Sequence, residues 1–359
     1  MKVALVHDWL IHMRGGERVL ESLAEVFPEA TIYTLFLNRS RLSPPLQRMK
    51  IKTSMLQRFH GIRRYYRWLL PLLPFFIQSL RIEEAEVVIS SSHCVAKGVQ
   101  IPSSARHLCY CFTPMRYLWG FEKEYFGNFP RPLLSLLKPI LDRLRAWDRS
   151  TSRQVDQFFC ISETVKERIR NIYEKEATVI YPPVDTEFFK PDPAIKRDDY
   201  YLVVSALTPY KRIDLVIEAF NHWERRLLIV GDGPLRTRYQ RLAKVRNIRF
   251  LGRVPDEELH KLYCGARALI FPQEEDFGII PLEAQACGLP VIAFAKGGAL
   301  ETVKEGVFFY DQSLQAIRQA VLEFEDGHFD SEALRRHAQQ FDKTLFKNKI
   351  RQVVEHAYR

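Results

Sequence analysis

The sequence lacks the features that mark membrane-spanning, secreted and metal-binding chains. The closest candidate for a spanning helix, residues 68–80, is interrupted by Pro71 and Pro74 and is shorter than the ~18–20 apolar residues that a bilayer requires. Met1-Lys2 leads directly into an apolar strand, so no signal peptide is expected. The six cysteines form no C-x-x-C pair, which predicts buried free thiols in a reducing compartment and neither disulfides nor a metal site. We therefore expect a cytoplasmic protein.

Acidic residues are absent from a long segment of the N-terminal half, in a chain whose net charge is +10. Between residues 31 and 82 there is no Asp or Glu, whereas Lys and Arg occur ten times with aromatic residues among them. This mixture suits an anionic membrane surface, where each well-placed cation contributes about 1 kcal/mol. The alternatives are a solvated basic face and a nucleic-acid patch, and no nucleic-acid-binding motif supports the latter. The residues predicted to contact the membrane are Arg63, Arg64, Arg67 and Trp68.

Length and apolar patterning together predict two α/β domains. The chain has 359 residues, 47% hydrophobic and 27% charged, which is typical of a soluble globular enzyme with room for two cores. Short apolar runs alternate with amphipathic segments such as residues 17–27 and 213–220, which predicts parallel sheets covered by helices on both faces. The expected strands are residues 3–7, 31–36, 87–91, 108–111, 157–161, 201–206, 227–230, 248–251, 268–271 and 291–293.

The boundary between the two domains is expected near residues 181–185, where two consecutive prolines fix an extended backbone. We therefore predict one domain over residues 1–180 and a second over residues 181–342. Residues 343–359 carry apolar side chains at helical spacing, which predicts a C-terminal helix that can pack back on the first domain.

Residues 272–290 form the strongest candidate site, because ligands of doubly wound sheets bind beyond the carboxyl ends of the strands. Here an apolar strand leads into an acidic loop, and Gly278 permits close backbone approach before a helix begins. The N-terminus of that helix offers free N–H groups and a positive dipole end to a diphosphate. Glu275 is then expected to meet a sugar and Glu283 the ribose hydroxyls. Taken alone, these carboxylates could instead serve only to cap the helix.

Other strand-end loops carry glycines or cations. Gly15-Gly16 opens the first helix, where the backbone can approach a phosphate or an acceptor, although turn glycines are common. Lys211 and Arg212 could neutralise a departing diphosphate, or simply be solvated. Residues 230–234 begin like a dinucleotide fingerprint, but an arginine replaces its third glycine, which argues against NAD. Gly297-Gly298 either lines a pocket or forms a plain turn.

Residues 272–290 resemble the E-x7-E signature of the family 4 retaining glycosyltransferases, which have the GT-B fold. The resemblance covers nearly the whole chain and is to the branch that includes the WbaZ-like mannosyltransferases of surface-polysaccharide synthesis. Further motifs occur in the order of that branch, and they are residues 6–9 with 14–17, 90–98, 113–117, 182–185 and 209–214.

The resemblance implies a GT-B α/β fold, with two doubly wound Rossmann-like domains facing across a cleft. The first domain would bind the acceptor and the second the nucleotide-sugar donor. It further implies transfer with retention by front-face attack, with no metal, no other cofactor and no enzymic nucleophile. We favour GDP-mannose as the donor, a lipid-linked saccharide as the acceptor, and a peripheral location on the inner face of the cytoplasmic membrane. A UDP-sugar donor, a Rossmann enzyme of another class and a non-catalytic membrane-associated binding protein are the alternatives.

Site residues follow from the resemblance at matching positions. The catalytic residues would be Glu275, Lys211 and Arg212. The donor-binding residues would be Gly15, Gly16, Gly231, Gly233, Phe277, Gly278, Ile279, Ile280 and Glu283. The acceptor or sugar pocket would include His93, His107, Arg116, Gly297 and Gly298.

The chain departs from the family at two positions. Ala206 stands where the family commonly has Arg, so Arg212 or another cation is expected to supply that charge. Phe112 stands where related sequences often have His, and its apolar ring cannot hydrogen-bond a sugar. His93 and His107 are the candidates to replace that histidine.

Overall fold

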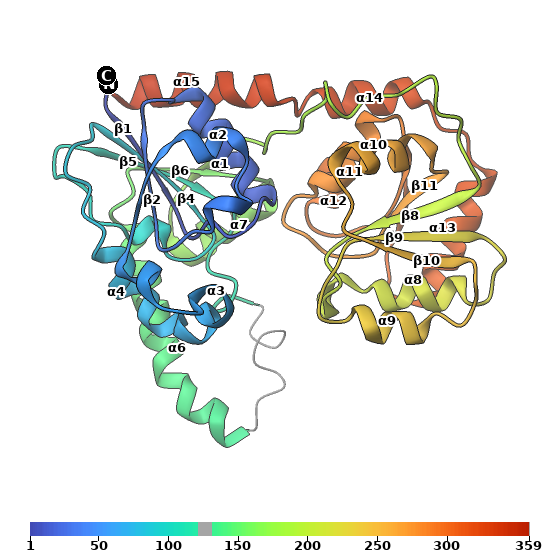
Figure 1. Ribbon diagram of the computed structural model, residues 1–359, viewed down its shortest axis with the longest axis horizontal. Coiled ribbons are helices and arrows are strands. Elements are labelled where there is room, and N and C mark those ends of the chain that lie inside the picture. The colour runs from blue at the N-terminus through green and yellow to red at the C-terminus, as the bar shows by residue number, and fades with distance from the viewer. Residues whose placement is uncertain (121–130, 359) are drawn as a thin grey trace. The chain divides into compact units, whose positions relative to one another are not determined.

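The computed structural model describes residues 1–120 and 131–358, with the side chains of all of these except residues 67 and 131–136. Two compact units make up the chain, one of Met1–Pro183 with Thr344–Arg359 and one of Val184–Lys343 (Figure 1). The chain thus leaves the first unit after Pro183 and returns to it for its last helix.

The first unit is built on a seven-stranded sheet in the order β3-β2-β1-β4-β5-β6-β7, in which all neighbouring strands are parallel. The sequence direction of the sheet reverses between β1 and β4, which makes their carboxyl ends the topological switch point where ligands of such sheets bind. The strands are β1 (Val3–His7), β2 (Thr31–Thr34), β3 (Lys50–Thr53), β4 (Val87–Ser92), β5 (Arg106–Cys111), β6 (Gln157–Cys160) and β7 (Ala177–Val179).

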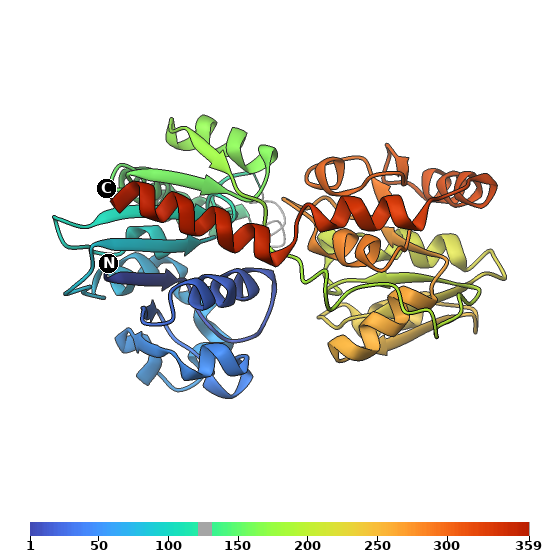
Figure 2. The same ribbon diagram turned by 90° about the horizontal axis from the view of Figure 1, so that it is seen from above.

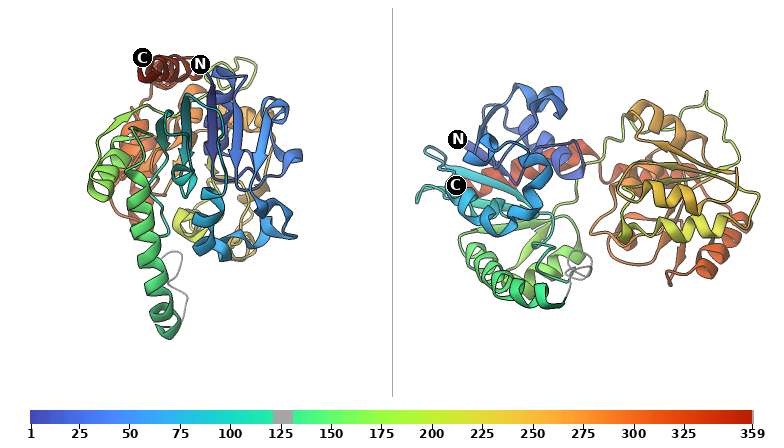
Figure 3. Two further views of the ribbon diagram at one scale, coloured as in Figure 1. Left: turned by 90° about the vertical axis from the view of Figure 1, so that its left-hand side faces the viewer. Right: turned by 60° about the horizontal axis from the view of Figure 1, so that its bottom comes forward.

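Helices connect these strands, and each buries one apolar face. In α1, for example, Val19, Leu20 and Leu23 are buried, as their spacing along the sequence predicts. Figure 3 shows α6 extending beyond the sheet. The α-helices are α1 (Gly15–Val26), α2 (Pro44–Arg48), α3 (Ile62–Tyr65), α4 (Leu73–Gln78), α6 (Arg131–Ser152) and α7 (Glu163–Tyr173). Short 3₁₀ segments include η3 (Tyr66–Leu72) and η4 (Ala96–Gly98).

The last helix, α15 (Lys343–Tyr358), lies along the first unit (Figure 2). Phe346, Ile350 and Val354 form its buried face, and the Phe346 ring meets Tyr110 of β5 edge-on at 5.7 Å between centroids. The Tyr358 hydroxyl donates to Glu86 at 3.1 Å. The C-terminal segment therefore contributes to the core of the N-terminal unit.

The second unit repeats the doubly wound pattern with six strands in the order β10-β9-β8-β11-β12-β13, again parallel throughout. Its switch point lies between β8 and β11. The strands are β8 (Tyr200–Val204), β9 (Arg226–Val230), β10 (Ile248–Gly252), β11 (Ala268–Phe271), β12 (Val291–Phe294) and β13 (Val307–Phe309). The helices are α8 (Ile213–Phe220), α9 (Arg236–Leu242), α10 (Asp256–Gly265), α11 (Ile279–Ala286), α12 (Ala299–Thr302), α13 (Leu314–Asp326) and α14 (Ser331–Gln339), with the 3₁₀ turn η5 (Pro209–Lys211).

Both faces of the second sheet are buried. Along β8, Tyr201 and Val203 belong to one core cluster, whereas Tyr200 and Leu202 belong to another. Alternate side chains of a strand point to opposite faces, so these two clusters are the two layers between sheet and helices. This double burial explains why the strands are continuous apolar runs.

The predicted fold of two Rossmann-like α/β domains is confirmed, and all the predicted strands are present with small shifts at some ends. Three short strands were not predicted, namely β3, β7 and β13. None of the six cysteines forms a disulfide, and all six are buried. Within the described residues, no helix is long and apolar enough to cross a membrane.

Candidate active site

At the switch point of the first unit, a buried carboxylate holds two loops together. Asp8 directly follows β1 and is fully buried. Its Oδ2 accepts the backbone N–H groups of His93 at 2.8 Å and Cys94 at 3.1 Å, and its Oδ1 accepts those of Val95 at 2.6 Å and Ala96 at 2.7 Å. Burial by itself would raise the Asp8 pKa, but the His93 imidazole and these hydrogen bonds bring that pKa well below its usual range. Asp8 is therefore a fixed anion that shapes the loop after β4.

His93 stands on that loop and is oriented by Asp8. Its Nδ1 lies 3.0 Å from Asp8 Oδ2, and 33% of its side chain is exposed. Burial opposes the charged form of His93, but the charge and hydrogen bond of Asp8 outweigh it and raise the His93 pKa. Because Nδ1 faces the carboxylate, Nε2 points away from it, as in other carboxylate-oriented histidines. This arrangement can present a proton or a hydrogen bond to a ligand hydroxyl.

Aromatic rings and a helix N-terminus surround His93. The His93 ring centroid lies 4.7 Å from that of Trp9, 6.3 Å from that of His7 and 6.3 Å from that of Phe112. A Cβ placed on Gly16 would lie 3.5 Å from the Phe112 ring and 3.6 Å from His7 Cε1. The structure thus brings Gly16 and His93 to one edge, together with the Phe112 that replaces the family histidine.

Gly15 and Gly16 begin α1, and this helix start is held by its own cap. Glu17, at the third helical position, accepts the backbone N–H of Arg14 at 3.1 Å. Burial raises the Glu17 pKa. The Arg116 charge partly opposes the rise of the His93 pKa, so Arg116 is within electrostatic range of His93. Of the residues predicted for the first unit, Gly15, Gly16 and His93 therefore share one edge, and Arg116 acts on His93 through its charge.

His107 is not brought to this edge. It is the second residue of β5, near the amino end of the strand, and it is fully buried. Its Nε2 lies 2.8 Å from Ser90 Oγ. Burial lowers the His107 pKa to about 4, so its imidazole is neutral. This placement is that of a core histidine.

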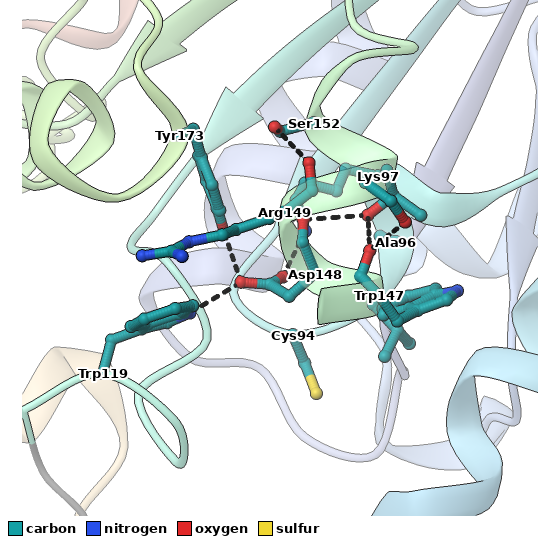
Figure 4. Close-up of polar contacts among 12 residues, drawn as sticks. Cys94, Ala96, Lys97, Trp119, Trp147, Asp148, Arg149, Ser152 and Tyr173 are labelled. Atoms are coloured by element: carbon teal, nitrogen blue, oxygen red, sulfur yellow. Dashed lines mark hydrogen bonds and ion pairs between the residues drawn. The ribbon is translucent and has the colours of Figure 1, made fainter. Parts of the chain in front are cut away.

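Behind the edge lies a buried ion pair between Lys97 of η4 and Asp148 of α6, which are 1% and 0% exposed. Figure 4 shows Trp119 and Tyr173 converging on the Asp148 carboxylate. Trp119 Nε1 donates to Asp148 Oδ2 at 2.8 Å, and the Tyr173 hydroxyl donates to the same oxygen at 2.9 Å. Two buried charges are tolerated when such hydrogen bonds satisfy them. Because Lys97 directly follows the loop bound by Asp8, this network anchors that loop to α6 and α7.

At the switch point of the second unit, two of the three predicted catalytic residues meet. Lys211 follows β8 and Glu275 follows β11, and Lys211 Nζ forms an ion pair with Glu275 Oε1. Gln273 Nε2 donates to the same oxygen at 3.3 Å. The two charged side chains are 11% and 22% exposed. A half-buried, hydrogen-bonded pair of this kind is held in place before any ligand arrives.

The acidic loop that carries Glu275 is held against two glycines. Gly298 donates its backbone N–H to Glu275 O at 2.8 Å. A Cβ on Gly297 would lie 2.4 Å from Glu275 O, and one on Gly298 would lie 2.1 Å from Phe277 O. These positions thus require glycine because the backbones approach closely. The geometry assigns Gly297-Gly298 a supporting role under the loop.

Gly278 forms the N-cap of α11 with φ of 113°, and Ile279 and Ile280 begin the helix. The first backbone N–H groups of a helix have no intrahelical partner and suit an anion. Glu283 lies one turn further, is 7% exposed, and accepts the Tyr263 hydroxyl at 3.1 Å. Phe277 is 3% exposed and packs against Phe341, with ring centroids 5.9 Å apart. Glu275 and Gly278 therefore flank one helix start, while Phe277 and Glu283 are mostly covered.

The glycine loop after β9 packs on the loop after β8. Gly231 has φ of 125°, and a Cβ there would lie 1.9 Å from Ser205 O. A Cβ on Gly233 would lie 2.5 Å from Leu207 O. Close packing of the two loops therefore explains both glycines without a ligand. They are nevertheless at the same edge as Lys211.

Arg212 is connected to the loop after β11 by Gln312, which contacts both. Its Nη1 lies 3.5 Å from Gln312 Oε1, while Gln312 Nε2 donates to Pro272 O at 2.8 Å. Arg212 Nε also lies 3.6 Å from Asp214. The cation that pairs with Glu275 is therefore Lys211. Arg212, the next residue in the chain, instead contacts Gln312 and Asp214.

Sequence reasoning assigned no role to Asp8, Gln273 or Gln312, although the first two lie within segments that it singled out. A signal for Asp8 was present, because a carboxylate directly after the first apolar strand must lie at the carboxyl edge. The partners of Gln273 and Gln312 depend on which strands are neighbours, which the order of elements along the chain does not give.

Comparisons with known proteins agree with this architecture. The family model for Glycosyltransferase Family 4 matches residues 13–188, and that for Glycosyl transferases group 1 matches residues 185–341. A GDP-mannose-dependent α-(1-6)-phosphatidylinositol monomannoside mannosyltransferase of Mycolicibacterium smegmatis is 33% identical over 187 residues, which cover 44% of this chain and 49% of that protein. The D-rhamnosyltransferase WbpZ of Pseudomonas aeruginosa is 28% identical over 236 residues, 60% of each chain. This chain spans about half the length of the first curated relatives it matches.

Among solved structures, sucrose-phosphate synthase from Thermosynechococcus elongatus superposes with a TM-score of 0.76 at 15% identity, over 100% of this chain and 99% of that one. The fold and its neighbours define a GT-B glycosyltransferase architecture. The chain belongs to family 4 of the glycosyltransferases, the glycosyl transferases group 1.

Proposed function

We propose that this chain is a retaining glycosyltransferase that moves a hexose from a nucleotide sugar to a lipid-linked saccharide, with mannose from GDP-mannose as the favoured donor. The observation that carries the proposal is the Lys211–Glu275 pair beside the N-terminus of α11, at the switch point of the second sheet. The name of the mycobacterial relative supports GDP-mannose. The rhamnosyltransferase relative shows that sugar choice varies among similar proteins.

The second unit would bind the donor. The N–H groups at Gly278, Ile279 and Ile280 would hold its diphosphate, because a helix N-terminus attracts anions. Glu283, oriented by the Tyr263 hydroxyl, would accept the ribose hydroxyls. The loops at Gly231, Gly233, Gly297 and Gly298 would shape the site through the close contacts described above.

Lys211 and Arg212 would then stabilise the negative charge that develops on the departing nucleoside diphosphate. Glu275 would orient the donor sugar and support the positive charge that develops at its ring. In front-face attack the leaving diphosphate itself takes the proton of the acceptor hydroxyl, so the mechanism requires no enzymic nucleophile and no catalytic metal.

The first unit would bind the acceptor. With Phe112 at the family's histidine position, His93 is a partly exposed polar side chain at that edge, and Asp8 raises its pKa. A protonated His93 would donate a hydrogen bond from Nε2 to a sugar hydroxyl. Arg116 and the Gly15-Gly16 helix start would contact the anionic part of the acceptor or donor.

A membrane surface would present the lipid-linked acceptor. Several apolar side chains of the acid-free segment are largely exposed: Trp68 at 72%, Phe75 at 62%, Phe59 at 58% and Tyr65 at 53%. Arg63 and Arg64 are exposed beside them, while the Arg67 side chain lies outside the described part of the chain. Exposed aromatic and basic side chains together favour an anionic bilayer. We propose a peripheral protein on the cytoplasmic side of the membrane.

The decisive experiment measures nucleoside diphosphate release from a panel of GDP-, UDP- and ADP-sugars, with and without a polyprenyl-linked saccharide. We expect release from GDP-mannose and its loss in Glu275→Gln. Glu274→Gln is the matched control, because Glu274 lies one position away and pairs with Lys296 at 3.0 Å. Release from a UDP-sugar instead would correct the donor. If no donor is turned over or bound, the transferase proposal fails.

Vesicle co-sedimentation tests the membrane surface separately. Wild-type protein should bind vesicles that contain anionic lipid and not purely zwitterionic ones. An Arg63→Ser/Arg64→Ser/Trp68→Ser variant should lose this binding and keep its turnover of a soluble acceptor. Vesicle binding without any affinity for nucleotide sugars would favour the non-catalytic binding protein.

A further inference from the structure

A cluster of soft ligands lies in the second unit, apart from the proposed donor contacts. His260, Cys264 and Cys287 each offer one atom, and these three atoms lie within 4.8 Å of one another. Cys264 and Cys287 are buried, at 6% and 4% exposure, and the His260 side chain is partly buried. Three convergent ligands of this kind are the donor set of a zinc or other thiophilic metal site.

Local structure explains how three separate residues meet. His260 and Cys264 are four positions apart on α10, so they share one face of that helix. Cys287 follows the last turn of α11 as its C-cap residue. The segment that enters the second unit runs past them, because Lys190 O lies 2.6 Å from His260 Nε2 and 3.4 Å from Cys264 Sγ.

The distance between two of these atoms fits tetrahedral coordination. Zn²⁺ binds sulfur at about 2.3 Å and imidazole nitrogen at about 2.0–2.1 Å, so two such ligands lie about 3.5 Å apart at a tetrahedral angle. Cys264 Sγ lies 3.4 Å from His260 Nε2. His260 Nε2 donates its N–H to Lys190 O at 2.6 Å, so metal binding requires the imidazole proton to move to Nδ1, and it leaves Lys190 O, or a water in its place, as the fourth donor. Since three protein ligands are in reach already, the site requires only small side-chain movements.

We propose that His260, Cys264 and Cys287 bind a thiophilic divalent metal ion, of which Zn²⁺ is the representative, in a structural site. The sequence predicted no metal because it has no C-x-x-C pair. The His260-x3-Cys264 spacing indicates two of the three ligands, whereas Cys287 is distant in the sequence. Binding replaces the two thiol protons, which are released to solvent, while His260 binds as neutral imidazole.

This ion would tie together α10, the C-terminal end of α11 and the segment at Lys190. Cys287 is at the C-terminal end of α11, whereas Glu275 and Gly278 are at its N-terminal end, so the ion would not contact the proposed donor sugar. It would instead fix the helix whose N-terminus is proposed to bind the diphosphate. The site therefore acts on stability and on the position of α11, and it stands whether or not the donor assignment is correct.

The test uses the full chain, reduced and freed of metal, and adds Co²⁺ as a spectroscopic probe. We expect one equivalent of Co²⁺ to produce a thiolate-to-cobalt charge-transfer band, and one equivalent of Zn²⁺ to remove it. Zn²⁺ should also raise the melting temperature, since it binds the native state. Cys264→Ser and His260→Gln should each weaken Zn²⁺ binding by at least about tenfold. Cys160→Ser, a buried cysteine of the first unit, should bind Zn²⁺ as the wild type does.

Two results would overturn the proposal. One is a reduced wild-type protein that gives no charge-transfer band and no thermal shift at micromolar metal. The other is a protein purified without reductant in which Cys264 and Cys287 are joined in a disulfide and cannot be metallated after reduction. Because the cobalt titration is done on the wild type, a variant that fails to fold leaves the test intact.

Discussion

Lys211 and Glu275 are 64 positions apart in the sequence, yet their side chains form a direct ion pair. Each follows one of the two strands, β8 and β11, that flank the switch point of the second sheet. Neither side chain is more than 22% exposed, and Gln273 also donates to Glu275. Sheet order therefore places a cation and a carboxylate together at the edge where a doubly wound fold binds its ligand.

Replacing Lys211 by Met should lower kcat for nucleoside diphosphate release by about 10²–10³, because a preorganised charge on the leaving group is lost. Lys296→Met is the matched control, since Lys296 pairs with Glu274 at 3.0 Å but is 60% exposed. Exposed pairs contribute little, so this variant should keep near wild-type rates. A Lys211→Met enzyme with unchanged kcat would remove Lys211 from the catalytic group.

Gly16→Ala and Gly298→Ala should separate function from stability. At Gly16 a Cβ would meet only ordinary contacts at 3.5 Å, so the fold should keep its stability while the new methyl group, beside Phe112, raises KM for the acceptor. At Gly298 a Cβ would lie 2.1 Å from Phe277 O, so the acidic loop must move and both stability and kcat should fall. Thermal melts and steady-state kinetics on both variants test this. Equal loss of stability in the two would contradict the role given to Gly16.

The sequence predicted the class of fold and most of the strands, because doubly buried strands are continuous apolar runs. It named Lys211 and Glu275 separately, but their pairing depends on β8 and β11 being neighbours. Alternation of strands and helices along a chain does not fix that order. The Asp8–His93 contact was hidden for the same reason, since it joins loops 85 positions apart.

Short or polar elements were also beyond sequence reasoning. β3 is Lys-Ile-Lys-Thr and only partly buried, so it has no apolar run to reveal it. His107 was a candidate to replace the family histidine at Phe112, but five positions along a strand separate two residues by about 16 Å. The buried partners Lys97 and Asp148 have no local pattern, because their meeting depends on how η4 packs against α6.

Removing one member of the buried Lys97–Asp148 pair should destabilise the protein strongly. Asp148→Asn leaves the Lys97 cation buried without its counter-charge, which typically costs about 3–5 kcal/mol. The double variant Lys97→Met/Asp148→Asn should lose less than the sum of the single variants, as measured by urea unfolding. Lys2→Met is the contrasting case, because its partner Glu84 lies at 2.7 Å on the surface and stability should hardly change. If the losses of unfolding free energy in the two single variants add up to the loss in the double variant, the two charges do not depend on each other.

Stability should fall as the pH is lowered from about 6.5 to about 4, since burial lowers the pKa values of His7 and His107 to about 4. In this window the unfolded chain binds a proton at each histidine, whereas the folded protein does not, so protonation favours unfolding. His93 has the opposite sign: Asp8 raises its pKa, so its contribution is present below about 6.5 and is lost as the pH rises.

His107→Gln tests this linkage directly, through the slope of unfolding free energy against pH. Loss of one titrating group should reduce that slope between pH 4 and 6.5 by up to about 1.4 kcal/mol per pH unit. Ser90→Ala is the matched control, because it removes the 2.8 Å contact to His107 but keeps the imidazole. It should lower stability at every pH and leave the slope unchanged. If His107→Gln retains the wild-type slope, His107 is protonated in the folded protein and its burial does not govern acid unfolding.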